Sequence, residues 1–127
     1  KMVKPGESLE FEGIKIESVP AYNLEKSFHP RENGWLGFII DTQNMRIYHT
    51  GDSDFIPEMK SLNVDVILVP IGGTYTMDAR DAARLVNELN PKFVIPMHYG
   101  SIVGSDRDLE EFKKLSNVNV VLKEPYK

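Results

Sequence analysis

The sequence predicts an α/β protein in which helices pack on a layered sheet. Short apolar runs that suit buried strands occur at 64–70 and 93–97. Each is followed by a segment with helical spacing of apolar residues, at 78–90 and 106–115. The first half is rich in short strand-like segments. A β-rich start followed by alternating strand and helix is typical of an α/β layered architecture.

The first half of the chain reads as two hairpins. Residues 8–11 and 14–19 form the first, across a Glu-Gly turn, and the second of these strands alternates apolar and charged residues. A polar segment from 21 to 33 is expected to be an exposed loop. Residues 35–40 and 45–49 form the second hairpin.

A short helix is expected next. Asp54 can cap a helix that runs to about residue 61, with Phe55, Met59 and Leu62 spaced for a buried stripe. This helix would join the second hairpin to the buried strand at 64–70.

The second half contains the two longer helices. Asp78 is expected to begin the first, which ends at Asn90-Pro91 and buries one side: Ala82, Leu85, Val86 and Leu89. Asp106 can cap the second, which runs to about residue 115 and buries Leu109, Phe112 and Leu115. A last strand is expected at 118–122, so the chain ends on the sheet.

Length and composition restrict the class of protein. With 127 residues the chain is one soluble globular domain, or part of one, and no apolar stretch approaches the roughly 20 residues of a membrane span. The net charge of −4 and the lack of a basic cluster argue against nucleic acid as a partner. The chain opens on no apolar leader and has no cysteine, which favours the cytoplasm and leaves only nitrogen and oxygen metal ligands.

Three polar clusters follow apolar strands, at 50–53, 71–74 and 96–100. Ligands of layered α/β proteins bind at such strand ends, because rigid strands position the loops that follow. Asp52 is a candidate metal ligand, although judged alone a turn-forming aspartate bonded to local backbone is the better interpretation. His98 is a candidate ligand or general base, although it could be a half-buried histidine satisfied by a carbonyl.

The segments Arg46-Ile-Tyr-His-Thr-Gly-Asp-Ser-Asp-Phe-Ile-Pro-Glu-Met59, Val64-Asp-Val-Ile-Leu-Val-Pro-Ile-Gly-Gly-Thr-Tyr-Thr-Met77 and Val94-Ile-Pro-Met-His-Tyr-Gly100 resemble the metallo-β-lactamase superfamily. The resemblance is to its branch of small metal-dependent hydrolases, related to the ascorbate-lactonase-like proteins. It runs from about Val19 to Leu115, and the three segments keep the family's order and spacing.

This resemblance implies a metal-dependent hydrolase. The aspartate of the family's Gly-Asp-Ser/Thr turn bridges two metals and falls on Asp52, and the histidine of its Pro-Met-His-Tyr-Gly segment binds the second metal and falls on His98. The implied metal is divalent, Zn in the first place, with Mn, Fe or Ni also compatible. A metal-bound hydroxide would attack an ester, lactone, amide or phosphoester bond of a small molecule.

Two departures from the family pattern stand out. Where many relatives place a ligand histidine after the strand that precedes the second hairpin, this chain has Asn23. His29 could supply the imidazole instead, although it could equally be an exposed loop histidine with no metal role. The family's His-x-His-x-Asp-His motif is absent. His49, the remaining histidine, could reach the site edge, but a strand residue satisfied within the sheet is the better interpretation.

Residues 1–127 are therefore expected to form a single unit equivalent to the C-terminal half of an αββα sandwich, a fragment that lacks part of the active site. Such a half would expose an apolar inner sheet face, to be covered by a missing N-terminal half or by a second copy in a homodimer. The alternative function is a non-catalytic structural or assembly module that keeps the fold but not the metal. A nucleotide site at 71–74 is disfavoured, since the Gly-Lys-Ser/Thr of a phosphate loop is missing.

Overall fold

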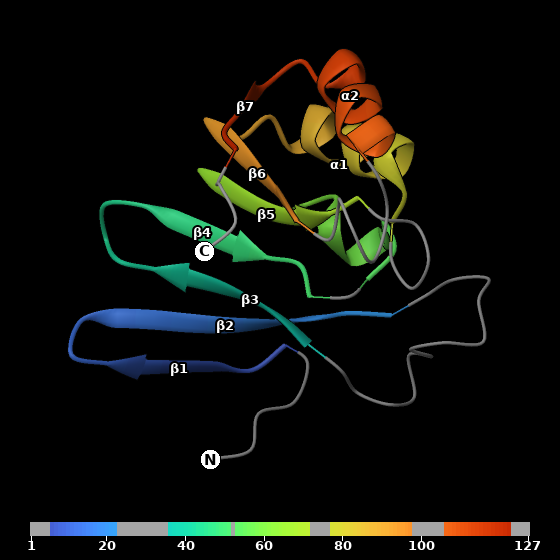
Figure 1. The fold of residues 1–127 in the computed structure, drawn as a ribbon. Coiled ribbons are helices and arrows are strands. Elements are labelled where there is room, and N and C mark those ends of the chain that lie inside the picture. Colours follow the sequence, from blue (N-terminus) through green and yellow to red (C-terminus); the bar gives the residue numbers. More distant parts are fainter. Residues whose placement is uncertain (1–5, 23–35, 52, 72–76, 98–105, 123–127) are drawn as a thin grey trace, which may run out of the picture.

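The protein is built on one seven-stranded sheet (Figure 1). The computed structural model describes residues 6–22, 36–51, 53–71, 77–97 and 106–122. The strands are β1 (Ser8–Phe11), β2 (Ile14–Pro20), β3 (Leu36–Asp41), β4 (Arg46–His49), β5 (Val66–Pro70), β6 (Phe93–Met97) and β7 (Asn119–Val120). The helices are η2 (Pro57–Met59), α1 (Ala79–Leu89) and α2 (Asp106–Leu115).

The strands pair in the order in which they occur along the chain. β1 to β4 are antiparallel, and β4 to β7 are parallel. The first hairpin turns through Glu12 and Gly13, both with positive φ, and the second through Gln43, also with positive φ. The parallel strands are joined by crossovers, which contain η2 between β4 and β5, α1 between β5 and β6, and α2 between β6 and β7. The predicted α/β class, with its β-rich start and alternating second half, is confirmed.

The hydrophobic core lies between the sheet and the helices. Ile39, Tyr48, Ile67 and Val94 are in register across β3, β4, β5 and β6, and none is more than 2% exposed. They belong to the same buried cluster as the inward side of α1 and as Phe112 of α2. The apolar stripe predicted for α1 is thus buried.

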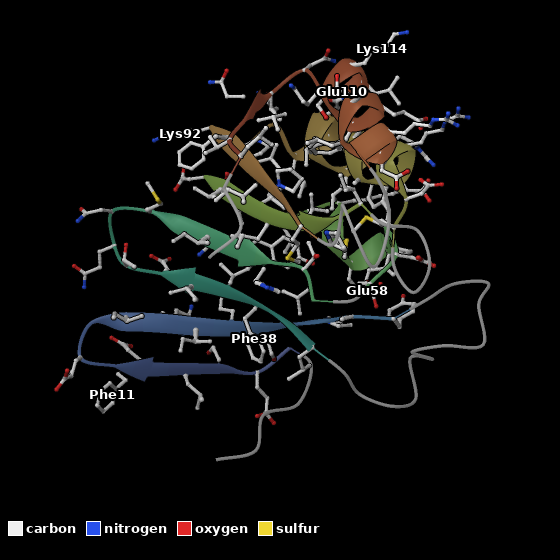
Figure 2. The ribbon with its side chains drawn as sticks, in the orientation of Figure 1. Phe11, Phe38, Glu58, Lys92, Glu110 and Lys114 are labelled. Carbon is white, nitrogen blue, oxygen red and sulfur yellow. The ribbon has the colours of Figure 1, made fainter. Side chains whose placement is uncertain are left out.

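The opposite face of the sheet is also apolar. Since side chains alternate between faces, the neighbours Phe38 and Ile40 of β3 point away from the helix layer. They are 36% and 37% exposed, and Phe11 of β1 is 72% exposed. Figure 2 shows Phe11 and Phe38 in the part of the sheet built by β1, β2 and β3, remote from the two helices. Within the segments that the structure describes, both α-helices belong to the other face.

The expected helix from residue 54 to 61 is wrong. Only the single 3-10 turn η2 forms, and it begins after Ile56 without a side-chain cap. The Asp54 N–H instead donates to the Tyr22 carbonyl at 3.0 Å, so the chain at this point is tied to the end of β2. Met59 is nonetheless fully buried, and Phe55 and Leu62 pack against the core as the stripe predicted.

The end of the chain also differs from expectation. Leu115 is 39% exposed rather than buried, and the last strand is reduced to Asn119–Val120, with Val121 and Leu122 exposed beyond it. As the edge strand, β7 pairs with only two residues of β6, Phe93 and Val94. The chain therefore leaves the sheet sooner than its apolar composition suggests.

The ends of α1 follow the prediction. Asp78 is its N-cap and accepts a 2.8 Å hydrogen bond from the Asp81 N–H, while Asn90 closes it in the left-handed conformation. Asp106 is the first residue of α2. Its side chain is outside the described part of the structure, and so is its predicted capping role. No helix in the described segments is long and apolar enough to cross a membrane.

Candidate functional site

One edge of the sheet gathers the ends of four strands. β4, β5 and β6 are parallel, so His49, Pro70 and Met97 all end at this edge. β2 runs in the same direction, because it and β4 are both antiparallel to β3. Two hydrogen bonds extend the pairing past the strands, from the Thr50 N–H to the Leu68 carbonyl at 3.2 Å and from the Ile71 N–H to the Met97 carbonyl at 3.1 Å. The three strands that lead into the predicted clusters of polar residues all end here.

The predicted metal ligands Asp52, His98 and His29 lie outside the described residues, as does Asn23. For Asp52 and His98, the structure does describe residues that are adjacent in sequence. Gly51 and Ser53 flank position 52, and Met97 precedes position 98. The structure thus describes the backbone that leads into these positions from β4 and β6.

Ser53 connects three of the segments that meet at this edge. It is fully buried, and its Oγ accepts a hydrogen bond from the Tyr22 N–H at 3.1 Å. The hydroxyl proton is shared between the carbonyls of Tyr22, at 3.2 Å, and Asp54, at 2.9 Å. The Ser53 carbonyl accepts from the Met77 N–H at 3.0 Å. The end of β2, the turn after β4 and the residue before α1 are therefore held together.

The turn after β4 also lies close against the start of β3. Gly51 has φ +66, and a Cβ at this position would lie 2.8 Å from the Leu36 carbonyl oxygen. A Cβ on Gly37 would lie 2.6 Å from the His49 carbonyl oxygen and 2.8 Å from that of Thr50. Both positions require glycine, because any side chain would meet backbone rather than a movable group. The path of the chain into position 52 is thus narrowly fixed.

Two tyrosines, Tyr22 and Tyr48, interact with Glu58, the first by a hydrogen bond and the second through its charge. The Tyr22 hydroxyl donates to Glu58 Oε1 at 2.7 Å. Tyr48 is fully buried, and its hydroxyl has no hydrogen-bond partner among the residues described. Burial, with the negative charge of Glu58, raises the pKa of the Tyr48 phenol above its ordinary value. Tyr48 thus stays protonated at neutral pH.

His49 has a local structural contact. It is exposed in β4, and its Nδ1 accepts a 3.1 Å hydrogen bond from the Gly51 N–H. This bond helps to close the turn after β4, which agrees with a structural role for the ring at the sheet.

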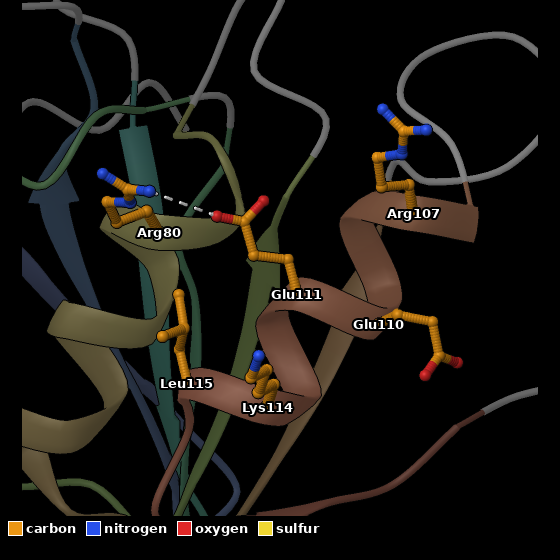
Figure 3. A pocket seen from close by; sticks show the side chains of 6 residues that line it. All are labelled: Arg80, Arg107, Glu110, Glu111, Lys114 and Leu115. Carbon is orange, nitrogen blue, oxygen red and sulfur yellow. Dashed lines mark ion pairs between the residues drawn. The ribbon is translucent and has the colours of Figure 1, made fainter.

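The described residues alone do not form a cluster of potential metal ligands. No group of three or more His, Asp or Glu side chains that could hold a metal occurs among them. An open depression of about 540 Å³ lies between the helices instead (Figure 3). It is lined by Arg80, Arg107, Glu110, Glu111, Lys114 and Leu115, and Arg80 pairs with Glu111 at 3.7 Å.

Sequence reasoning missed Ser53, Tyr22 and Glu58 as parts of this edge. Ser53 stands in the Gly-Asp-Ser cluster, which was a signal for its location. Its partner Tyr22 is 31 residues away in sequence, and Tyr22 and Glu58 are 36 residues apart. Contacts of this separation depend on the strand pairing and have no local signature.

Comparisons with known proteins agree on one family. Residues 1–98 match the family described as a β-lactamase superfamily domain. A protein of Thermococcus onnurineus named as a metal-dependent hydrolase is 38% identical over 111 residues, which cover 84% of this chain and 50% of the relative. The chain spans about half the length of the curated relatives it matches.

Solved structures give the same result. A protein of Parabacteroides distasonis, described as a metal-dependent hydrolase, superposes with a TM-score of 0.85 at 33% identity, over 99% of this chain and 58% of the other. A Thermotoga maritima protein, described as a Zn-dependent hydrolase of the metallo-β-lactamase superfamily, gives 0.73 at 26% identity, over 95% and 70%.

Proposed function

The chain belongs to the metallo-β-lactamase superfamily, as its three motifs predict, and from that premise we propose that it is the C-terminal half of a metal-dependent hydrolase domain. The observation that carries the proposal is the convergence at one sheet edge of the segments that lead into the motif positions. β4 and β6 lie on the two sides of β5. β4 ends at His49, shortly before position 52, and β6 ends at Met97, the residue before position 98.

In this proposal Asp52 and His98 are metal ligands, and His29 supplies a further imidazole. A carboxylate and neutral imidazoles form the donor set that divalent metals such as Zn²⁺ accept, and Mn, Fe or Ni fit the same donors. When bound, the metal lowers the pKa of a coordinated water and so supplies a nucleophile near neutral pH. The chain's own part is to fix the ligand positions, which the buried contacts of Ser53 and the glycine packing at Gly37 and Gly51 support.

The proposed substrate is a small molecule with an ester, lactone, amide or phosphoester bond. The relatives' names support hydrolysis and metal dependence without naming a substrate. We further propose a cytoplasmic location, which the absence of cysteine from these 127 residues supports.

A second sheet is the proposed partner of the apolar face. Phe11, Phe38 and Ile40 are exposed large hydrophobic residues on strands, and such faces are stabilised by packing against another sheet. An N-terminal half supplied as further polypeptide would cover this face in the proposed hydrolase. With only this chain present, a second copy would cover it in a homodimer.

The experiment that tests the proposal is metal analysis of the purified chain. The chain is loaded with Zn²⁺, dialysed, and analysed for metal beside Asp52→Asn, His98→Ala and His29→Ala. Asp41→Asn is the matched control, because Asp41 is a partly exposed carboxylate at the opposite end of the sheet. We expect about one or two metals per chain, lost in Asp52→Asn and His98→Ala but not in Asp41→Asn.

A well-folded chain that retains no metal would contradict the proposal for this polypeptide. It would favour the alternative, a structural or assembly module that keeps the fold without the metal. Metal retained equally in all the variants would show that the ligands are different residues. Hydrolysis of a panel of lactones, esters and phosphodiesters by the loaded chain then identifies the substrate class.

A further inference from the structure

Ser53 makes more cross-segment contacts than its size suggests. Its side chain bonds both the N–H and the carbonyl of Tyr22, and its own carbonyl holds the Met77 N–H. Asp54, the next residue, donates its N–H to the same Tyr22 carbonyl. A fully buried hydroxyl with these partners is costly to remove, because two backbone groups of Tyr22 lose a bond at once.

We propose that Ser53 is a positioning residue, which fixes the backbone at position 52 relative to the end of β2 and to the segment before α1. The proposal rests on the proposed function, because it assigns Asp52 as the ligand that is positioned. Position 52 is joined to Ser53 by one peptide unit, whose planarity fixes the distance between the two Cα atoms, so a shift of Ser53 must be taken up at position 52 or by rotation beside it. The residues after Tyr22 lead toward His29, so a single hydroxyl joins the two chain segments that carry these candidate ligands.

The chain offers a matched control for a purely structural serine. Ser18 is 5% exposed, and its Oγ accepts from the Glu7 N–H at 3.0 Å and donates to the Glu7 carbonyl at 3.1 Å. It therefore makes the same pair of backbone contacts as Ser53 makes with Tyr22. It joins β2 to the residue before β1 and touches neither Gly51 nor Asp54 by any hydrogen bond that the structure describes. If removing a buried serine hydroxyl only lowers stability in general, Ser18→Ala and Ser53→Ala should have the same effects.

The first measurement is Zn²⁺ affinity, with thermal unfolding measured on the same samples. We expect Ser53→Ala to raise the Zn²⁺ dissociation constant by about tenfold or more. Losses of affinity of this size follow when the residues that hold metal ligands in place are removed. Ser18→Ala should lose comparable stability with its Zn²⁺ affinity unchanged. Ser53→Thr, which keeps the hydroxyl, should recover affinity relative to Ser53→Ala. Equal Zn²⁺ affinity in Ser53→Ala and Ser18→Ala would overturn the proposal.

The second measurement needs no metal and separates this proposal from the proposed function. Amide hydrogen exchange of Asp54 and Met77 is informative, because their bonds to the Tyr22 and Ser53 carbonyls involve backbone only. If Ser53 positions the turn, both amides exchange faster in Ser53→Ala and keep the parent rate in Ser18→Ala. Parent-like exchange at both amides in Ser53→Ala would overturn it. If the parent chain binds no Zn²⁺, the proposed function is contradicted. Amide hydrogen exchange then still tests whether Ser53 positions the turn, because it needs no metal.

Discussion

The Cα of Gly37 faces the His49 carbonyl so closely that a Cβ there would lie 2.6 Å from its oxygen. Gly37→Ala should therefore lower the free energy of unfolding by about 1–3 kcal/mol, since backbone must move to admit the methyl group. Exchange of the Thr50 amide, which bonds the Leu68 carbonyl, should accelerate. The control is Gly6→Ala, where the positive φ of +83 also strains an alanine but the added Cβ would meet no atom within 4 Å, so Thr50 exchange should keep its parent rate. Parent stability in Gly37→Ala would mean that the strand ends are not packed this closely.

The stability of the β3–β4 hairpin should depend on pH through Asp41. The pKa of Asp41 lies below its ordinary value of 3.8. The main cause is a hydrogen bond from the Gln43 N–H, and the hydrogen bond and positive charge of Arg46 lower it further. A carboxyl whose pKa is lowered in the folded state stabilises it above the unfolded value and loses that contribution as pH falls through the folded value. Asp41→Asn should thus be less stable than the parent at neutral pH, with the difference shrinking as pH drops below 3.8.

Urea unfolding of both proteins across this range measures the effect. The expected difference is small, because the Arg46–Asp41 pair is partly exposed. A stability difference that stays constant down to acidic pH would show that the ionised form of Asp41 is not favoured by folding.

Removing the Tyr48 hydroxyl should not destabilise the protein. The fully buried Tyr48 hydroxyl has no hydrogen-bond partner among the residues that the structure describes, so Tyr48→Phe should leave the free energy of unfolding unchanged or raise it by about 1 kcal/mol. Tyr22→Phe is the contrasting variant. It loses the 2.7 Å bond to Glu58 and should lower stability by about 1–2 kcal/mol.

The same phenol predicts an alkaline effect. Because burial raises the pKa of Tyr48 above its ordinary value of 10.0, the unfolded chain releases this proton first, and the parent should lose stability above that pH. Tyr48→Phe should lack this part of the loss in thermal melts. A clear loss of stability in Tyr48→Phe at neutral pH would instead show that the hydroxyl has a partner, such as a buried water.

Sedimentation of the isolated chain tests the coverage of the apolar sheet face. We expect a homodimer, and Phe38→Lys should shift it toward monomer by placing a charge within the sheet-to-sheet contact. Leu115→Lys is matched in exposure, at 39% against 36% for Phe38, but lies on α2, and it should leave the dimer intact. A parent monomer in dilute solution would contradict the prediction.

Much of the fold was predictable from local pattern. The buried strand at 93–97 and the helix from Asp78 to Asn90 have strong periodicity and clear end signals, and the structure has them at those bounds. Of the helix expected after Asp54, only the 3-10 turn Pro57–Met59 forms, and the Asp54 N–H bonds the Tyr22 carbonyl in a contact between distant segments that local pattern does not reveal. Leu115 was expected to be buried from spacing alone, but at the end of α2 it lines the open depression beside Arg80 and is 39% exposed.

The candidate site was predictable only in part. Motif positions after β4 and β6 identified Asp52 and His98 as candidates, and the strand ends do meet at one edge. The buried contacts of Ser53 could not be read from sequence, since its bonds to Tyr22 arise from the pairing of β2, β3 and β4. Residue types predict chemistry at a position, whereas the support of that position depends on tertiary structure.

The order of strands in the sheet has a consequence for synthesis on the ribosome. In the part of the chain that the structure describes, each strand after β1 pairs with the strand made just before it, and none has to wait for a later strand to insert between existing neighbours. The growing chain can add strands to one advancing edge, with each new strand covering the backbone groups left open by the last. Such sequential growth limits how long an unpaired edge is available to other nascent chains, and unpaired edges are a main route to aggregation.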